Sequence, residues 1–237
     1  MLQAADAAFA RVPILDAWDE TPSLRALRLD LGALSNEHRA PGQVVRARPS
    51  SDGGEGYFAL ASAPQAGPAE LLLKRGGAVA DHLIAASGAG GALEVSAPFG
   101  RGFPVEELRG RDVLLFAAGS GIGAIRALVQ HLVAVRPAVG RIALWYGQRD
   151  EDHFAYRGEH ASWERAGVRV RLCCSQPGPS CRGARGRVQE VARDENLGGI
   201  EPSRAVACLC GMKGMVTDVR ALLAEAGMPA ANVHLNY

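Results

Sequence analysis

Apolar and polar residues alternate along the first hundred residues in the way that is typical of short strands. Leu27, Leu29 and Leu31 are separated by polar or charged residues. Further short segments of this kind lie between turn-rich stretches and cover residues 43–48, 56–61, 70–75 and 92–96. Because short strands at this spacing are typical of small antiparallel sheets, the first half is predicted to form an antiparallel β-barrel or sandwich, with one short helix that starts near Val79.

The second half has a different period. Residues 112–118 form a continuous apolar run, as expected for a parallel strand that is buried on both faces, and apolar residues at helical spacing follow from Ile125 to Val133. Further strands are predicted over residues 142–146, 168–173, 205–210 and 232–237, and a final helix over 216–226 with Gly227 as its C-terminal cap. This alternation predicts an α/β domain with a parallel sheet. We place the boundary near residues 107–111, which gives domains 1–108 and 109–237.

Composition narrows the class of protein. The chain has 237 residues, 48% of them apolar and 22% charged, as in ordinary soluble proteins. A formal net charge of +1 gives no indication of a nucleic-acid partner. We find neither a basic leader followed by an apolar run nor about 18 uninterrupted apolar residues, so a cytoplasmic protein without a membrane span is expected. The pattern makes no prediction of oligomeric state.

The five cysteines are expected to be reduced thiols. Cys173 and Cys174 are adjacent, and one residue separates Cys208 from Cys210. Neither spacing matches a zinc or iron–sulfur site, so no metal centre is predicted. Buried strand cysteines are the simplest interpretation of all of them except Cys210.

A glycine-rich turn joins the first predicted parallel strand to its helix. Gly119, Gly121 and Ala124 satisfy the pattern G-x-G-x-x-G/A. Residues without a bulky side chain allow a tight turn, and the exposed N–H groups and helix dipole favour a dinucleotide pyrophosphate. Two other interpretations are a tight turn without a ligand and a site for S-adenosylmethionine. Enzymes of the latter kind usually carry an acidic residue before the glycines, where this chain has Ala117 and Ala118.

Several segments occur in the order found in a known family. The strand-rich half ends in 97–104 (APFGRGFP), and AAGSGIGAI (117–125), LWYGQRDEDHFAY (144–156), CLCGMKGM (208–215) and the terminal Tyr237 follow. Over residues 10–237 the chain resembles the ferredoxin–NADP reductase family, including relatives that serve as electron-transfer subunits. The resemblance implies a flavin-binding barrel and a nicotinamide-nucleotide domain that pass hydride between NAD(P)H and FAD. It also implies an acceptor, either a protein or a small molecule, that receives the electrons from the flavin.

The resemblance also implies roles for individual residues of the nucleotide half. Cys210 is implied as the catalytic-site residue beside the nicotinamide. The residues implied to bind the nucleotide are Gly119, Ser120, Gly121, Ile122, Gly123, Arg149, Gly211 and Met212. Arg149 can meet the 2′-phosphate of NADP, but Asp150, Glu151 and Asp152 follow it, so the sequence leaves the choice between NAD and NADP open.

The flavin half departs from the family pattern. The motif Arg-x-Tyr-Ser/Thr, aligned on residues 61–64, has Gly56 at the Arg position, Phe58 at the Tyr position and Ala59 at the hydroxyl position. The later Gly-x-x-Ser/Thr loop is Gly77 to Ala80, so a second hydroxyl is missing. The implied flavin contacts are Tyr57, Phe58, Ala59, Leu60, Ser62, Lys74, Gly77, Ala80 and the terminal Tyr237. Loss of the guanidinium predicts weak FAD binding.

Two classes of function therefore stay open. The first is a flavin-dependent oxidoreductase that takes hydride from NAD(P)H and passes electrons to an acceptor. The second is a flavin-free, nucleotide-binding regulatory or electron-transfer-complex subunit, because the arginine and both hydroxyls are lost together. A third, weaker interpretation makes the barrel an interaction module alone.

Overall fold

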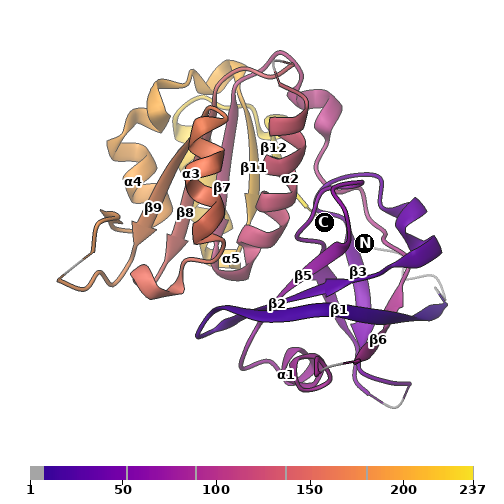
Figure 1. Cartoon of the computed structure of the whole chain (residues 1–237). Coiled ribbons are helices and arrows are strands. Elements are labelled where there is room, and N and C mark those ends of the chain that lie inside the picture. Colours follow the sequence, from indigo (N-terminus) through magenta and orange to yellow (C-terminus); the bar gives the residue numbers. More distant parts are fainter. Residues whose placement is uncertain (1–7, 52, 89, 137, 180, 237) are drawn as a thin grey trace.

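The computed structural model describes residues 8–51, 53–88, 90–136, 138–179 and 181–236. It contains two six-stranded sheets, one from each half of the chain (Figure 1). The predicted combination of an antiparallel sheet followed by a parallel α/β sheet is confirmed.

The first sheet is an antiparallel barrel with strand order β4-β3-β6-β1-β2-β5. A bridge between Leu60 and Leu71 brings its two ends together. Leu27 and Leu29 lie on one face of their strand and are fully buried in the barrel core, as their alternation predicts. The elements of this half are β1 (Phe9–Thr21), β2 (Leu24–Leu29), β3 (Val44–Arg48), β4 (Gly56–Ala59), β5 (Ala69–Lys74), α1 (Ala78–Ala85) and β6 (Ala92–Ser96).

The second sheet is parallel, with strand order β10-β9-β8-β7-β11-β12. Its strands are β7 (Val113–Ala118), β8 (Ile142–Gln148), β9 (Val168–Cys174), β10 (Ala184–Arg185), β11 (Val206–Cys210) and β12 (Val233–Leu235). Its helices are α2 (Ile122–Ala134), α3 (Arg157–Arg165), α4 (Val188–Asp194) and α5 (Lys213–Glu225). Short 3-10 helices connect elements in both halves: η1 (Gly32–Glu37), η2 (Val105–Leu108), η3 (Gly119–Gly121), η4 (Glu151–His153), η5 (Asn196–Gly199), η6 (Pro202–Arg204) and η7 (Ala230–Asn232).

Helices cover both faces of the parallel sheet. Leu115 of β7 packs in the cluster that includes residues of α2 and α3, whereas its neighbour Phe116 packs in the cluster that includes residues of α4 and α5. All six residues of β7 are buried, which confirms the strand buried on both faces that the apolar run predicts. Gly227, at φ +83°, follows the end of α5 as the predicted cap, and the next residue, Met228, donates its N–H to the carbonyl of Leu223.

Two strands and two α-helices were not predicted: β1, β10, α3 and α4. The longest strand, β1, has an irregular pattern of burial and two register shifts, so strict alternation is absent. Helix α3 buries only His160 and Trp163, and α4 has seven residues, so neither presents a long apolar stripe. At the C-terminus, the predicted strand 232–237 is shorter, and Tyr237 lies outside the described residues.

Candidate active site

The glycine turn joins β7 directly to α2. Gly119 has φ +59°, a left-handed conformation that favours glycine, and α2 begins at Ile122. A Cβ on Gly121 would lie 2.3 Å from the carbonyl oxygen of Cys210. The turn therefore brings the N-terminus of α2 against the end of β11, and a side chain at Gly121 would separate them.

The segment after β11 forms the other wall of this junction. Cys210 is in register with Ala117 of β7, and a Cβ on Gly211 would lie 3.1 Å from the Cβ of Ala118. Strands β8 and β9 follow β7 on one side, whereas β11 lies on its other side, so the strand order reverses here. Ligands of open α/β sheets bind at the carboxyl ends of the strands at such a switch point.

Burial determines the protonation state of the Cys210 thiol. The side chain is half-buried at the end of β11, and burial raises the pKa of its thiol to about 12. At neutral pH the group is therefore a protonated, weakly polar thiol. It can pack against a flat ring, but it does not supply a thiolate.

A cleft of about 850 Å³ opens from this junction toward the barrel. The α/β half contributes the ends of β7, β8, β9 and β11 and the first turns of α4 and α5. The barrel contributes residues of β2, β4 and β5, and the rims carry the exposed side chains of Tyr57 and Met212, which are 52% and 66% exposed. Both halves of the chain thus form the walls of one cleft.

The cleft gathers eleven of the residues that the resemblance implies. These are Tyr57, Phe58, Ala59, Lys74, Gly119, Ser120, Gly121, Arg149, Cys210, Gly211 and Met212. The structure does not bring the others to its lining: these are Leu60, Ser62, Gly77, Ala80, Ile122 and Gly123, and Tyr237 lies outside the described residues. Leu60 and Ala80 are buried in the barrel core, and the Ser62 hydroxyl accepts a hydrogen bond from the Glu70 N–H, so each has a structural partner instead.

Gly123 and Gly77 have identifiable positions in the fold. A Cβ on Gly123 would lie 3.1 Å from the Cβ of Ala61, so its small size allows α2 to pack closely against the barrel. Gly77 is the residue before α1. Helix α1 lies on the side of the barrel away from the parallel sheet (Figure 1).

Sequence reasoning missed several cleft residues. Arg187 lines the cleft immediately before α4, and the Gln189 amide donates a hydrogen bond of 3.0 Å to the Asp218 carboxylate across the same wall. Gly147 is also required there, since a Cβ would lie 2.7 Å from the Val188 side chain. After β9 the chain passes through β10 to α4, and this path places the start of α4 at the carboxyl edge of the sheet. Prediction of β10 and α4 would have located these residues, but neither element was predicted.

Two arginines give the outer end of the cleft a positive charge. Arg149 follows β8, and its side chain is 61% exposed with a contact of 3.3 Å to Asp150. A hydrogen bond from His153 and then Arg149 lower the pKa of Asp150 and hold its carboxyl ionised. Asp150 therefore engages two cationic or polar partners, while the Arg187 guanidinium has no hydrogen-bond or ion-pair partner among the residues that the structure describes.

The barrel wall is apolar where the family motif is charged. A Cβ on Gly56 would lie 2.9 Å from the Phe58 ring and 3.2 Å from Val79. The Phe58 ring and Val79 thus occupy the space into which an arginine side chain at position 56 would extend. Lys74, exposed at the end of β5, is the cation among the barrel residues that line the cleft.

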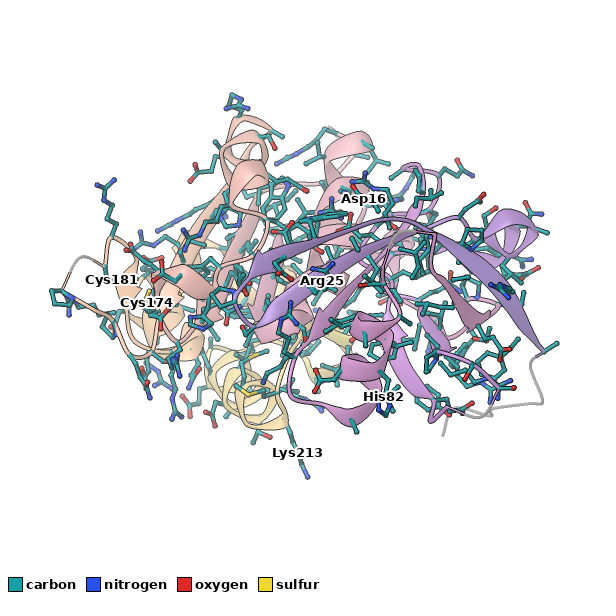
Figure 2. All side chains as sticks on the ribbon, turned by 60° about the horizontal axis from the view of Figure 1, so that its bottom comes forward. Asp16, Arg25, His82, Cys174, Cys181 and Lys213 are labelled. Carbon is teal, nitrogen blue, oxygen red and sulfur yellow. The ribbon has the colours of Figure 1, made fainter. Side chains whose placement is uncertain are left out.

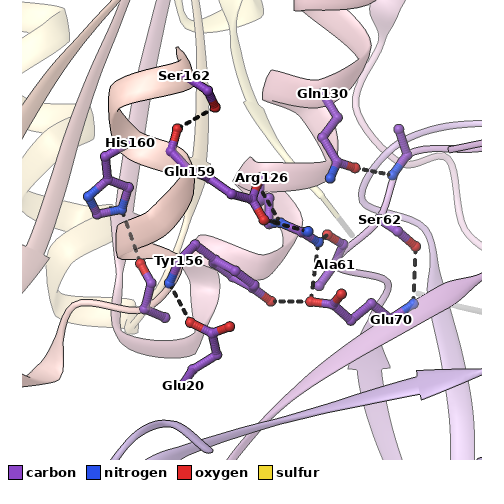
Figure 3. A network of polar contacts seen from close by, with 12 residues as sticks. Glu20, Ala61, Ser62, Glu70, Arg126, Gln130, Tyr156, Glu159, His160 and Ser162 are labelled. Carbon is purple, nitrogen blue, oxygen red and sulfur yellow. Dashed lines mark hydrogen bonds and ion pairs between the residues drawn. The ribbon is translucent and has the colours of Figure 1, made fainter. Parts of the chain in front are cut away.

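A buried polar network fixes the two halves relative to each other (Figure 3). Arg126 of α2 donates hydrogen bonds to the Ala61 carbonyl at 2.7 Å, to the Glu70 carboxylate at 3.2 Å and to Glu159 at 2.7 Å. The Tyr156 hydroxyl donates to the same Glu70 oxygen at 2.9 Å. Burial raises the pKa of Glu70, and Arg126 opposes that shift. Five hydrogen-bonding groups therefore meet where α2 and α3 face β5.

The described residues contain no group of three or more His, Cys, Asp or Glu side chains arranged to hold a metal ion. Among the same residues, the helices all lack the length and apolar character needed to cross a bilayer.

Comparison with known proteins agrees with this geometry. The family model of the oxidoreductase NAD-binding domain matches residues 115–221, which contain the glycine turn, the end of β8 and the Cys210–Gly211 segment. Fruit protein pKIWI502 of Actinidia deliciosa is 26% identical over 181 residues, 73% of this chain and 56% of that protein. A probable dihydroorotate dehydrogenase B (NAD(+)), electron transfer subunit of Methanothermobacter thermautotrophicus is 30% identical over 160 residues, 68% of this chain and 53% of that protein. The chain thus matches little more than half the length of these two relatives.

A ferredoxin NADP+ reductase from Neisseria gonorrhoeae, solved with bound FAD and NADP, has the same fold. The TM-score is 0.82 at 16% identity, and the match covers 97% of this chain and 98% of the other. At this identity the likeness concerns the fold, and it extends over both halves of the chain.

Proposed function

We propose that the chain, which has an oxidoreductase NAD-binding domain and the fold of a ferredoxin NADP+ reductase, is an NAD(P)H-dependent flavin oxidoreductase that passes electrons to a separate acceptor. One observation carries the proposal: a single cleft is lined by the glycine turn and the Cys210–Gly211 segment on one side and by the aromatic residues of β4 on the other. A nicotinamide at the switch point and a flavin on the barrel would face each other across it.

In this proposal the α/β half binds and orients the nucleotide. The N–H groups of Gly119 to Gly121, at the start of α2, bind the pyrophosphate. Cys210 and Gly211 leave a small, flat surface for the nicotinamide, and the neutral thiol adds no charge beside the ring that gives up hydride. No side chain is required to act as acid or base, since the hydride chemistry belongs to the two cofactors.

On the barrel, the residues present fit the ring system of a flavin better than its phosphates. Tyr57 and Phe58 provide an aromatic wall, and the backbone of β4 offers peptide groups for polar contacts. Lys74 is the barrel cation within reach, and the position of the family arginine is Gly56, closed by Phe58 and Val79. When bound, FAD would accept hydride and release electrons. We infer that Tyr57, Phe58 and Lys74 hold it, with lower affinity than a guanidinium would give.

We further infer a preference for NADPH over NADH. Arg149 directly follows β8, and Arg187 directly precedes α4. In folds of this kind the adenosine ribose binds in this region. A 2′-phosphate carries close to two negative charges and accepts charge-assisted hydrogen bonds from guanidinium groups. The open Arg187 side chain has no other described partner to compete with it.

The acceptor is proposed to be a protein that docks at the mouth of the cleft, where Tyr57 and Met212 are exposed. The name of the Methanothermobacter relative describes an electron transfer subunit, which suggests a complex of this type. A small acceptor, such as a quinone, would reach the same opening.

A second function has its own support. The closed position at Gly56 and the missing hydroxyls at Ala59 and Ala80 favour a protein that keeps the fold and the nucleotide site without flavin. Such a protein would serve as a nucleotide-binding regulatory subunit or as a subunit of an electron-transfer complex.

One experiment separates the two. The purified protein is mixed with FAD, freed of excess, and its visible spectrum is recorded before and after anaerobic addition of NADPH or NADH. A retained flavin band that bleaches, faster with NADPH, is the expected result. Nucleotide binding measured by calorimetry without any retained flavin would establish the second function instead, and absence of both would overturn both proposals.

A further inference from the structure

Two thiols lie near each other beside the nucleotide end of the cleft, and the proposed hydride transfer uses neither of them. Cys174 is the last residue of β9, and Cys181 lies in the connection to β10 (Figure 2). The Cys181 thiol donates to the Gly183 carbonyl at 3.7 Å, and a Cβ on Gly183 would lie 3.3 Å from the Cys174 sulfur. Both thiols therefore pack on the same residue, Gly183, and lie close enough to influence each other electrostatically.

The two thiols differ in access. Cys174 is buried, whereas Cys181 is half-exposed and faces an oxidant first. Burial, and next the neighbouring Cys181, raise the pKa of Cys174 to about 12, so its thiol stays protonated at neutral pH. Of the other cysteines, Cys173 and Cys208 are buried in the cores, and Cys210 lies at the switch point.

We propose that Cys174 and Cys181 form a reversible disulfide, with a small-molecule disulfide such as glutathione disulfide as the oxidant. The Cys181 sulfur, after losing its proton to solvent, attacks one sulfur of glutathione disulfide and expels a glutathione thiolate, which takes up a proton. The Cys174 sulfur then loses its proton and attacks the Cys181 sulfur, and the second glutathione leaves in the same way. Two protein thiols are oxidised to one disulfide, and one glutathione disulfide is reduced to two thiols.

The connection that carries these thiols is tied to the nucleotide end of the cleft. The Ser175 N–H donates to the Gln148 carbonyl at 3.0 Å, and the Gln176 N–H donates to the Arg149 carbonyl at 2.7 Å. The N–H of Arg182, next to Cys181, donates to the Glu151 carboxylate. Hydrogen bonds from both ends of the connection thus hold the segment that carries Arg149.

Disulfide formation would change this arrangement. A disulfide brings its two sulfurs to about 2.05 Å of each other, so we expect Cys181 to be drawn toward β9. That movement pulls Arg182 away from Glu151 and loosens the segment with Arg149. We therefore expect oxidation to weaken NADPH binding at least threefold; this second part rests on the proposed function, whereas formation of the disulfide does not.

The test treats the whole chain with excess glutathione disulfide and compares it with protein kept in dithiothreitol. Free-thiol titration should fall from the five cysteines of the sequence to three, and peptide mapping should find Cys174 joined to Cys181. The Cys181→Ser protein should keep its four remaining thiols free. If Cys181→Ser does not fold, Cys174→Ala is the second variant, and the same result is expected. Cys208→Ala, which removes a thiol far from the pair in the sequence, is the control that should still form the bond.

Calorimetry with NADPH on the oxidised and reduced forms completes the test. A threefold or larger rise in Kd that dithiothreitol reverses and Cys181→Ser abolishes is the expected result. A stable glutathione adduct on Cys181, five unreacted thiols, or a disulfide that leaves Kd unchanged would each overturn the inference. Reduced wild-type protein that binds no nucleotide would overturn the proposed function alone, since the thiol count does not depend on it.

Discussion

The two walls of the cleft depend on different kinds of interaction. The α/β wall is built from backbone: Gly119, Gly121 and Gly211 allow two turns and a helix N-terminus to meet, and the absence of a Cβ is what the geometry requires. The barrel wall of the family depends on side chains, an arginine and hydroxyls, and here Gly56, Phe58 and Ala59 replace them. A backbone site is kept as long as three glycines are kept, whereas a side-chain site is weakened by single substitutions that leave the fold intact.

The cleft keeps its two walls only if the two halves of the chain keep one relative placement, so the largest expected effect is at the polar network of Arg126 that fixes it. Arg126→Met leaves the buried Glu70 carboxyl without its guanidinium partner and should lower the free energy of unfolding by about 3–5 kcal/mol. Urea denaturation measures it. Adding Glu70→Gln to the same chain should restore part of the loss, because a neutral amide costs less to bury than an unpaired charge.

Arg193→Met is the matched control for that substitution. It removes an exposed arginine from an ion pair with Glu225, whose partners are 56% and 66% exposed, and should change stability by no more than about 0.5 kcal/mol. Equal losses from Arg126→Met and Arg193→Met would show that the buried network does not join the halves.

The backbone wall is tested by Gly121→Ala. The new methyl group would meet the Cys210 carbonyl at 2.3 Å, so the glycine turn and the end of β11 must separate. We expect the Kd for NADPH to rise at least about 30-fold, equivalent to roughly 2 kcal/mol, while binding of FAD to the barrel stays unchanged. Gly158→Ala, in α3 with open space around its Cβ position, is the control and should bind both as the wild type does. A Gly121→Ala protein with unaltered NADPH affinity would refute the assigned site.

The parts of the backbone wall can be located in the sequence because each of them is a short, continuous segment. The glycine pattern, the buried strand before it and the Cys210–Gly211 segment are local. Seven of the eleven implied residues that line the cleft come from this half of the chain, and four come from the barrel. Arg187 was missed because it depends on where the chain returns after β9, which no local period reveals. Ser62 and Ala80 illustrate the opposite case: the resemblance implies them as flavin contacts, but in the structure their side chains face structural partners.

The side-chain wall is tested by returning a guanidinium to it. Gly56→Arg should raise FAD affinity about tenfold over the neutral variant Gly56→Gln, because a charge-assisted hydrogen bond contributes about 1.5–3 kcal/mol. The new side chain must displace the Phe58 ring and Val79, whose contacts at 2.9 Å and 3.2 Å involve movable side-chain atoms. Flavin fluorescence quenching measures the affinity. Equal affinities of the Arg and Gln variants would show that this position no longer faces the phosphates.

A smaller effect is expected at the outer end of the nucleotide site. Arg187→Ala and Arg149→Ala should each raise the Kd for NADPH about three- to tenfold, because each substitution removes one charge-assisted contact between an exposed guanidinium and the 2′-phosphate. The Kd for NADH should change less than twofold, and it serves as the internal control in the same calorimetric series. Parallel losses for both nucleotides would assign the arginines to a shared part of the ligand, and the inferred preference for NADPH would fail.

The smallest effect is predicted for pH, and it follows from the thiol at the switch point. Burial raises the pKa of Cys210 to about 12, so the thiol is protonated throughout pH 6–9 and its charge does not change there. Deprotonation would begin only as pH approaches that raised value, so the rate of flavin reduction by NADPH in FAD-loaded protein should have the same pH profile in the wild type and in Cys210→Ser. Stopped-flow reduction of the flavin band across this range measures it. A change in the reduction rate near pH 8–9 that occurs in the wild type and not in Cys210→Ser would mean that a thiolate forms beside the nicotinamide. The nucleotide site would then depend on a side chain as well as on the backbone.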